Sequence, residues 1–413
     1  MDQALLVGLS LYESHENTVR SLDELEHLAL AVGIQTVEKV IQNVKEISPK
    51  FYIGSGKVEE VKKKVELMAV DIVIFDDPLS PAQIKNLEKE LNVQVIDRSF
   101  LILSIFALRA QSKEAVLEVS LAQKLYMLPR LVGLGKSLSR QGGGTYNAKG
   151  PGETKLELDR RRLLNEIAFI RQELKKIKSE KDISRKQRLR NRIPVVALVG
   201  YTNAGKSSLM NSLSTHLNHG SADVLEKDML FATLDTKAKR LQKENHPPFI
   251  LVDTVGFINK LPHELVKSFE TTLSDVVDAD LLIHVVDGAF FDPIQIATTR
   301  QVLKEIGADS IERILVLTKK EIASDYPDLH DDFLFVSNRT KENIPELINA
   351  IYGHLFKDHR ICTLKIPFDS GQVYAKIKDQ NTVIETQYLD DGIYVRAILS
   401  KNEEIAYQAY LMG

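Results

Sequence analysis

Three Gly-Lys pairs stand out in the chain, because each could belong to a loop that binds phosphate. Such a loop needs the spacing G-x-x-x-x-G-K-[ST], with one glycine five residues before the second. The pairs at Gly56 and Gly135 fail this test, since Phe51 and Arg130 stand where the first glycine is needed. Only Gly200 to Ser207 has the required spacing, and it follows an apolar run that predicts a strand. We therefore expect the phosphate-binding loop there.

The residue types in this loop indicate what it would bind. Its backbone N–H groups and the N-terminus of the following helix should point at phosphate oxygens. Lys206 should reach the β- and γ-phosphates of a nucleotide, and the Ser207 hydroxyl should bind Mg²⁺. The alternative is a chance glycine turn, which the strand–loop–helix setting makes rare.

A second motif, Asp253-Thr-Val-Gly256, ends the next strongly apolar run. Its aspartate can hold Mg²⁺, usually through a water, and the N–H of Gly256 can sense a γ-phosphate. Thr233 lies between the two motifs. It is expected to be the second hydroxyl ligand of Mg²⁺, ordered only while γ-phosphate is bound, as in a nucleotide switch.

The base site is predicted at Thr318-Lys-Lys-Glu321, which follows another apolar strand. GTPases usually carry Asn-Lys-x-Asp there, and the aspartate accepts two hydrogen bonds from guanine. Glu321 keeps the charge but adds a methylene, so we expect GTP to be preferred over ATP by a reduced margin. A lost bidentate pair costs about 1–3 kcal/mol of discrimination in base readout elsewhere. Val336 to Asn338 should contact the base through backbone N–H groups.

Two residues bear on catalysis. Phe257 follows Gly256 at the place where Ras-type enzymes carry a glutamine that orients water, so hydrolysis by the isolated protein should be slow. Asn203 lies inside the phosphate loop. It either helps to bind K⁺, which would supply positive charge, or is an asparagine that suits a tight turn; the sequence leaves both open.

The predicted site residues fall into three groups. Catalysis is expected to depend on Lys206, Thr233 and Gly256, and Mg²⁺ on Ser207, Thr233 and Asp253. The whole nucleotide-binding set is Gly200, Tyr201, Thr202, Asn203, Ala204, Gly205, Lys206, Ser207, Ser208, Phe231, Ala232, Thr233, Leu234, Asp235, Asp253, Thr254, Val255, Gly256, Thr318, Lys319, Lys320, Glu321, Val336, Ser337 and Asn338.

The elements that position these residues follow from the spacing of apolar side chains. Residues 193–358 contain near-continuous apolar runs separated by helical segments, which predicts a doubly wound parallel sheet, a P-loop domain. Residues 1–110 alternate short strands and helices, which predicts a small α/β domain with a mostly parallel sheet. Residues 359–413 predict a small α+β domain. The fold class is therefore multidomain α/β.

Residues 111–192 predict an antiparallel helical hairpin, because leucines and isoleucines recur there at spacings of three and four. Its expected connection, residues 129–152, holds seven glycines and four basic residues but no acidic one. Residues 155–192 carry a net charge of +8, against −11 for the rest of the chain. A connection this long is either disordered or functional.

Bulk composition limits the class of protein. The net charge is −3, the hydrophobic content is 44%, and Cys362 is the one cysteine. One cysteine fits a reducing compartment, and no apolar run is long enough for a membrane span. We expect a monomeric cytoplasmic protein, associated with a membrane at most peripherally through ribosomes.

The chain resembles the HflX family of translational GTPases over nearly its whole length. The resemblance rests on "YIGSGKVEEV", "DRSFLILSIFALRA", "LAQKLYMLPRL", "LSRQGGG", "KGPGETKLELDRRR", "GYTNAGKSSL", "LFATLD" and "DTVGFI". It implies GTP hydrolysis with Mg²⁺, binding to the large ribosomal subunit and its RNA, and a role in splitting or rescuing stalled ribosomes under stress. The family's "LDPTTR" is "LDTKAK" here, and its glycine-rich loop reads "GGGTYNAKGPGE".

The resemblance also favours RNA as the partner of the hairpin tip, where composition alone leaves a solvated loop equally open. The expected RNA-binding residues are Arg130, Lys136, Arg140, Gly142, Gly143, Gly144, Tyr146 and Lys149. Two other functions remain possible from the sequence: a nucleotide-gated switch for a protein or another RNA with incidental hydrolysis, and an RNA remodeller that uses ATP.

Overall fold

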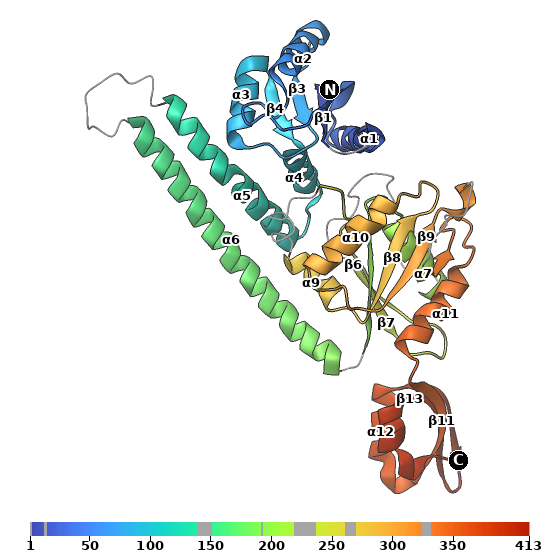
Figure 1. Cartoon of the computed structure of the whole chain (residues 1–413). Helices are drawn as coiled ribbons and strands as arrows, with labels where there is room; N and C mark the ends of the chain where they lie inside the picture. The colour runs from blue at the N-terminus through green and yellow to red at the C-terminus, as the bar shows by residue number, and fades with distance from the viewer. Residues whose placement is uncertain are drawn as a thin grey trace. The chain divides into compact units, whose positions relative to one another are not determined.

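The computed structural model describes residues 2–11, 15–138, 151–190, 193–218, 237–260, 270–323 and 332–412 (Figure 1). The chain divides into two compact units. Unit 1 comprises Met1–Ser179 and two short later segments, Asp228–Asp235 and Ile258–Thr272. Unit 2 comprises Glu180–Lys227, Thr236–Phe257 and Leu273–Gly413.

Unit 1 begins with a four-stranded parallel sheet in the order β2-β1-β3-β4. Its elements are β1 (Gln3–Ser10), α1 (His15–Ala31), β2 (Gln35–Asn43), α2 (Ser55–Met68), β3 (Ile72–Phe75), α3 (Pro81–Leu91), β4 (Gln94–Asp97) and α4 (Arg98–Arg109). β1, β3 and β4 are largely buried on both faces, as apolar runs such as Ile72–Phe75 require, whereas the edge strand β2 is mostly half-buried. The prediction of a small parallel α/β sheet is confirmed.

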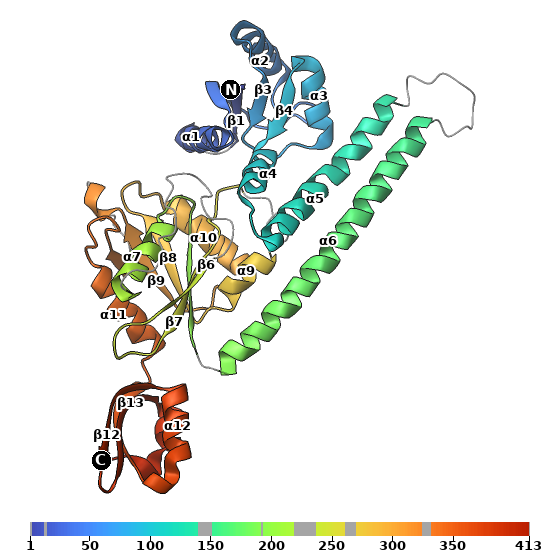
Figure 2. The same cartoon turned by 180° about the vertical axis from the view of Figure 1, so that it is seen from behind.

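Two long helices follow, α5 (Lys113–Leu138) and α6 (Pro151–Arg190). They lie side by side in both views (Figures 1 and 2), joined by a seam of Leu121, Ile167, Ile170 and Leu174. The predicted connection, residues 129–152, was too long at both ends. α5 continues through Pro129, because proline removes only one backbone N–H while Leu125 and Leu128 still pack on the seam.

Unit 2 contains a six-stranded sheet in the order β10-β9-β8-β5-β7-β6. Its strands are β5 (Val195–Gly200), β6 (Lys237–Leu241), β7 (Phe249–Asp253), β8 (Leu281–Asp287), β9 (Arg313–Thr318) and β10 (Phe333–Phe335). The main helices are α7 (Lys206–Asn218), α9 (Glu270–Val277), α10 (Pro293–Glu305) and α11 (Ile344–Leu355). All described pairings are parallel except that of the edge strand β6, which the sequence analysis missed.

The chain ends in a three-stranded antiparallel sheet, ordered β11-β13-β12. Its elements are β11 (His359–Ile366), α12 (Gly371–Gln380), β12 (Thr382–Leu389), β13 (Gly392–Ser400) and α13 (Lys401–Ala406). Ile377 of α12 packs against Leu364 and Val395 of the sheet. This is the α+β piece that the sequence predicted. Within the described residues, no helix combines the length and apolar character that crossing a membrane requires.

Candidate nucleotide site

The phosphate loop lies between β5 and α7, and its backbone conformation requires glycine at two positions. Gly200 has a φ of +150°, and a Cβ there would stand 2.1 Å from the Val285 carbonyl oxygen of the neighbouring strand. Gly205 has a φ of +88°. Both values favour glycine. The loop therefore approaches β8 more closely than any other residue type would allow.

Lys206 is the first residue of α7, and its side chain is buried. Its ammonium donates to the carbonyl oxygens of Tyr201, at 2.7 Å, and Gly200, at 3.1 Å. Burial lowers the pKa of Lys206 to about 8, although the Asp253 carboxylate offsets part of that effect. A phosphate would replace weak carbonyl partners by strong anionic ones, which suits a cation held in this pocket of backbone.

Ser207 and Asp253 lie together where Mg²⁺ was predicted. The Ser207 hydroxyl donates to Oδ2 of Asp253 at 2.6 Å, and Asp253 is fully buried at the end of β7. A hydroxyl and a carboxylate are the hard oxygen donors that Mg²⁺ accepts beside phosphate oxygens and water. No group of three or more His, Cys, Asp and Glu side chains that could hold a metal ion occurs among the described residues.

The Asp253–Gly256 motif is fastened to the phosphate loop by backbone hydrogen bonds. Phe257 donates to Gly200 O at 3.0 Å, and Thr202 donates to Phe257 O at 2.8 Å. A Cβ on Gly256 would lie 2.8 Å from the Thr202 Cα and 2.9 Å from the Lys206 Nζ. The structure thus brings Gly256 and Lys206 together, as the sequence predicted. It buries Phe257, which cannot orient a water.

The predicted switch residues fall outside this description. The switch residues that lie outside the described part of the chain are Phe231, Ala232, Thr233, Leu234 and Asp235.

Thr202 of the phosphate loop is described, and its buried Oγ1 has no hydrogen-bond partner among the described residues. A buried hydroxyl donor next to Lys206 is suited to a phosphate oxygen.

Thr318, at the end of β9, contacts the phosphate loop instead of reaching toward a base. Its hydroxyl donates to Ala204 O at 2.7 Å and lies 3.2 Å from Val286 O. Lys319 has a φ of +60°, and its ammonium pairs with Asp287 at 2.7 Å. Asp287 was absent from the predicted site. Its place at the end of β8, just before a glycine, was the signal that could have found it.

Glu321 is exposed in the short helix η2 (Lys320–Ile322), as an acceptor for a base would be. The neighbouring Lys320 forms an ion pair with Glu342, with its Nζ 2.5 Å from Oε1. Asn338 donates from Nδ2 to Gly205 O at 3.3 Å, and its buried Oδ1 has no hydrogen-bond partner among the described residues.

The backbone N–H groups of Val336 to Asn338 were expected to contact the base. For Val336 and Ser337 this expectation was wrong. Val336 donates its N–H to Leu317 O at 2.8 Å, and Ser337 donates to Glu342 O at 3.1 Å. Both N–H groups are therefore engaged within the protein: that of Val336 extends the pairing of β10 with β9, and that of Ser337 closes a turn with Glu342. Of the three residues, only Asn338 keeps the predicted role of contacting the base.

The predicted RNA-binding set lies mostly outside the description as well. Arg140, Gly142, Gly143, Gly144, Tyr146 and Lys149 lie outside the described residues, and Lys136 is described only as backbone of α5. Arg130 is described, and the structure gives it a different role. Its guanidinium contacts Asp97 Oδ2 at 3.2 Å and Leu79 O at 3.1 Å, and stacks 3.2 Å over the Tyr126 ring. Arg130 thus holds α5 against the first sheet, because Asp97 is buried and needs a cation.

Comparisons with known proteins identify the family of the chain. Residues 19–107 match the family model described as GTP-binding GTPase N-terminal, and residues 109–188 match GTP-binding GTPase Middle Region. Residues 195–319 match the model described as 50S ribosome-binding GTPase. The chain is similar to the GTPase HflX of Caldanaerobacter subterraneus subsp. tengcongensis, with 43% identity covering 96% of this chain and 90% of that one.

The chain is also 36% identical to the GTPase HflX of Escherichia coli, covering 94% of this chain and 91% of that one. A solved GTP-binding protein from Sulfolobus solfataricus in complex with GDP is 26% identical, with a TM-score of 0.43, covering 86% of this chain and 99% of that one. The chain is a GTP-hydrolysing enzyme with a P-loop GTPase domain. On the family matches and the two HflX relatives, the chain belongs to the HflX family of GTPases.

Proposed function

We propose that this GTPase binds the large ribosomal subunit and remodels, splits or rescues stalled ribosomes, with GTP controlling its switch segments. One observation carries the proposal: a GTPase domain of the ribosome-binding type is joined to a long helix whose basic residues are exposed. The exposed basic residues of α6 are Arg160, Arg161, Arg162, Arg171, Lys175, Lys176 and Lys178.

These exposed side chains can contact phosphate groups of RNA. Ribosomal RNA is a dense array of phosphates, and each contact made by a lysine or arginine releases a counterion. The predicted tip residues Lys136, Arg140 and Lys149 would add further phosphate contacts. Arg130 is excluded from this group by its contacts with Asp97.

The residues that would hold Mg²⁺ are Ser207, Asp253 and Thr233. Bound there, the ion would neutralise charge on the β- and γ-phosphates. Lys206 would bind the same phosphates, and the Gly256 N–H would report the γ-phosphate to the chain that follows. Asn203 has a φ of +59° and is exposed, a conformation that asparagine tolerates in turns. Binding of K⁺ there is the second role we propose to test.

Glu321 and Asn338 are proposed to read the base. An exposed carboxylate can accept from the two N–H groups on the guanine edge, which adenine lacks. Thr318 supports the loop and makes no such contact. We therefore expect GTP to bind more tightly than ATP, by less than with an aspartate at position 321. The protein would act as a monomer in the cytoplasm, next to membranes only through ribosomes.

Ribosome co-sedimentation tests the proposal. Isolated large subunits are mixed with the protein, with GDP or with a non-hydrolysable GTP analogue, at several salt concentrations. We expect the analogue to increase binding, and large subunits to accelerate slow hydrolysis by roughly 10³–10⁵, the range seen when GTPases receive a missing catalytic group. Equal binding with both nucleotides would favour a hydrolysis-independent binding module instead.

A matched pair of variants assigns the contact. The hairpin variant replaces three exposed arginines of α6 by alanine: Arg160, Arg161 and Arg162. The control variant makes the same charge change on the first sheet domain, at the exposed residues Lys50, Lys63 and Lys89. The hairpin variant should reduce the slope of log K against log salt by up to about 2–3, and the control should not. Equal behaviour of the two variants would contradict an RNA contact by α6.

A further inference from the structure

Lys319 joins the ends of two neighbouring strands, close in the chain to a residue proposed to read the base. It directly follows β9, and its ammonium stands 2.7 Å from Oδ2 of Asp287, the last residue of β8. β8 and β9 pair in parallel, with Asp287 opposite Thr318. The Lys319 side chain is 24% exposed and that of Asp287 is 11% exposed. The ion pair is therefore partly shielded from water, and both partners belong to unit 2.

The backbone of Lys319 has a conformation that lysine rarely adopts. Its φ of +60° and ψ of +34° are left-handed. A residue with a Cβ keeps such a conformation only where its surroundings hold it, and these residues are most frequent at functional sites. Two hydrogen bonds hold the turn: Ile322 N–H donates to Lys319 O at 3.1 Å, and Lys320 N–H donates to Val336 O at 3.3 Å. The turn ends β9 and begins η2, which carries Glu321.

Asp287 uses its two carboxylate oxygens for different contacts. Oδ1 accepts the backbone N–H groups of Ala289, at 3.0 Å, and Phe290, at 3.2 Å, and so folds the loop that follows β8. Oδ2 accepts from the Lys319 ammonium. The loop is also fixed to β9, because Gly288 N–H donates to the last carbonyl of that strand at 3.0 Å. Backbone contacts thus fix the short aspartate, which can then fix the long and flexible lysine.

Lys319 stands between the residue that supports the phosphate loop and the residue that is proposed to read the base. Thr318 before it donates to Ala204 O in the loop. Glu321, two residues after it, is exposed. A nucleotide with its phosphates in the loop and its base at Glu321 therefore lies beside Lys319. Because the ammonium is held by Asp287, the aliphatic part of the lysine can offer an apolar surface to one face of the base.

Packing against an aliphatic side chain differs from hydrogen bonding in what it recognises. Every base has a face that can be covered, so a contact of this kind supports guanine and adenine alike. The carboxylate of Glu321, in contrast, accepts from N–H groups that only guanine carries. A lysine without a partner must also lose rotamer freedom when a nucleotide binds. A lysine that is already held by Asp287 has lost that freedom beforehand, which favours binding.

We propose that Asp287 is a positioning residue of the nucleotide site, which holds the Lys319 side chain along the ends of β8 and β9 so that its aliphatic part supports the purine of GTP and ATP alike. Asp287 itself does not contact the nucleotide. The inference rests on the base site of the proposed function. It adds a contact that determines how tightly a nucleotide binds, whereas Glu321 determines which nucleotide is preferred.

Asp287→Asn is the first test variant, because its amide oxygen can still accept from Ala289 and Phe290 while the charge that faces Lys319 is lost. Lys319→Met removes the ammonium from the other partner, at a side chain that is only half-buried. The matched control is Asp309→Asn, at an exposed aspartate of the same domain. Titrations of the full-length protein give the affinities for GDP, ADP and inorganic tripolyphosphate, which has no base. Phosphate release gives KM and kcat for GTP.

Each test variant should bind GDP and ADP more weakly by a similar factor. We expect roughly 3- to 10-fold, between the effect of an exposed ion pair and that of a buried hydrogen bond to a charged group. Tripolyphosphate should bind as before. KM for GTP should rise by the same factor with kcat unchanged, because a contact made equally in the bound substrate and in the transition state affects KM alone. The double variant should bind no more weakly than the single ones, and the control should match the unmodified protein.

A purely structural role of the ion pair predicts other results. A distorted phosphate loop would weaken tripolyphosphate binding or lower kcat, and a contact that only stabilises the fold would leave the GDP affinity unchanged in folded variants, as thermal unfolding identifies them. Each of these results overturns the inference, and so does a loss confined to GDP. None of them bears on ribosome co-sedimentation, whereas the base site itself is tested separately by Glu321→Asp.

Discussion

An alanine at position 256 tests the geometry of the nucleotide site through a single methyl group. The added Cβ would lie 2.8 Å from the Thr202 Cα, a backbone atom, and 2.9 Å from its Cγ2. The Thr202 backbone is held by its own hydrogen bond to Phe257 O, at 2.8 Å. The contact cannot be relieved by rotating a side chain, so the loop or the Asp253–Gly256 segment must move.

Forcing extra volume into a packed site usually costs about 1–3 kcal/mol. For a domain of this size, each kcal/mol lowers the melting temperature by about 2–4 °C. Gly256→Ala should therefore lower the melting temperature by roughly 2–12 °C, measured by circular dichroism. It should also weaken binding of a non-hydrolysable GTP analogue more than binding of GDP, because the methyl group occupies the space beside Lys206.

Gly353→Ala is the matched control for this prediction. Gly353 lies in α11, and a Cβ there would meet no atom within 4 Å. Alanine is favoured over glycine inside a helix by about 0.5–1 kcal/mol, so the same chemical change should raise the melting temperature. If Gly256→Ala melts at or above the unmodified protein, the close approach of Gly256 to the phosphate loop is wrong.

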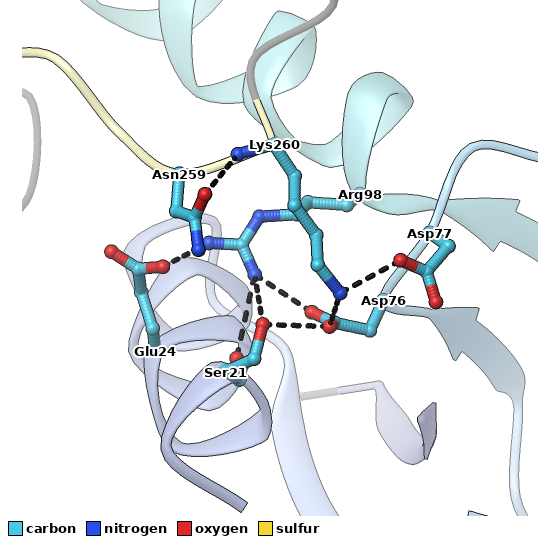
Figure 3. Close-up of polar contacts among 7 residues, drawn as sticks. All are labelled: Ser21, Glu24, Asp76, Asp77, Arg98, Asn259 and Lys260. Atoms are coloured by element: carbon cyan, nitrogen blue, oxygen red, sulfur yellow. Dashed lines mark hydrogen bonds and ion pairs between the residues drawn. The ribbon is translucent and has the colours of Figure 1, made fainter. Parts of the chain in front are cut away.

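Four further predictions follow from the same structure. Lys206→Ala should reduce nucleotide affinity and turnover strongly, because it removes the charged donor of the phosphate loop; unchanged turnover in a phosphate-release assay would reject the site. Glu321→Asp should widen the preference for GTP over ATP in competition binding, whereas a narrower preference would mean that the base motif is misplaced. If Asn203 helps to bind K⁺, hydrolysis should be faster in potassium than in sodium at equal ionic strength, and equal rates would leave it a turn residue. Burial would raise the pKa of Asp76, but the facing cations Arg98 and Lys260 (Figure 3) hold that pKa below 3.8. The ion pairs of Asp76 therefore stabilise the protein above pH 3.8, and this stabilisation is lost as the pH falls further. In urea titrations, Asp76→Asn should lower the free energy of unfolding at pH 7 and flatten its pH dependence below pH 3.8.

The phosphate side of the site was predictable because its residues are close in sequence. Gly200 to Ser207 form one loop, and their spacing alone defines what they can bind. The buried strands were predictable for a similar reason, since a parallel strand covered on both faces must be apolar along its length. The edge strand β6 was missed because its Lys-Ala-Lys-Arg-Leu sequence has a single buried side chain, Leu241.

The base side was predicted only in part, because it is assembled from the ends of separate strands. Thr318 was expected to face the base, but its hydroxyl donates to Ala204 O across 114 residues of chain. Lys319 is paired with Asp287, which the sequence places on another strand. No local pattern predicts either contact. They arise because parallel pairing brings the carboxyl ends of β8 and β9 to the same edge of the sheet.

Lys260 is the extreme case, since its partner Asp76 lies 184 residues earlier in the chain. The sequence does indicate the acidic side of this contact. Two aspartates end β3 at the point where a doubly wound sheet binds its ligand, and an acidic pair there calls for a cation. The cation, Lys260 of the same chain, can be identified only from the fold.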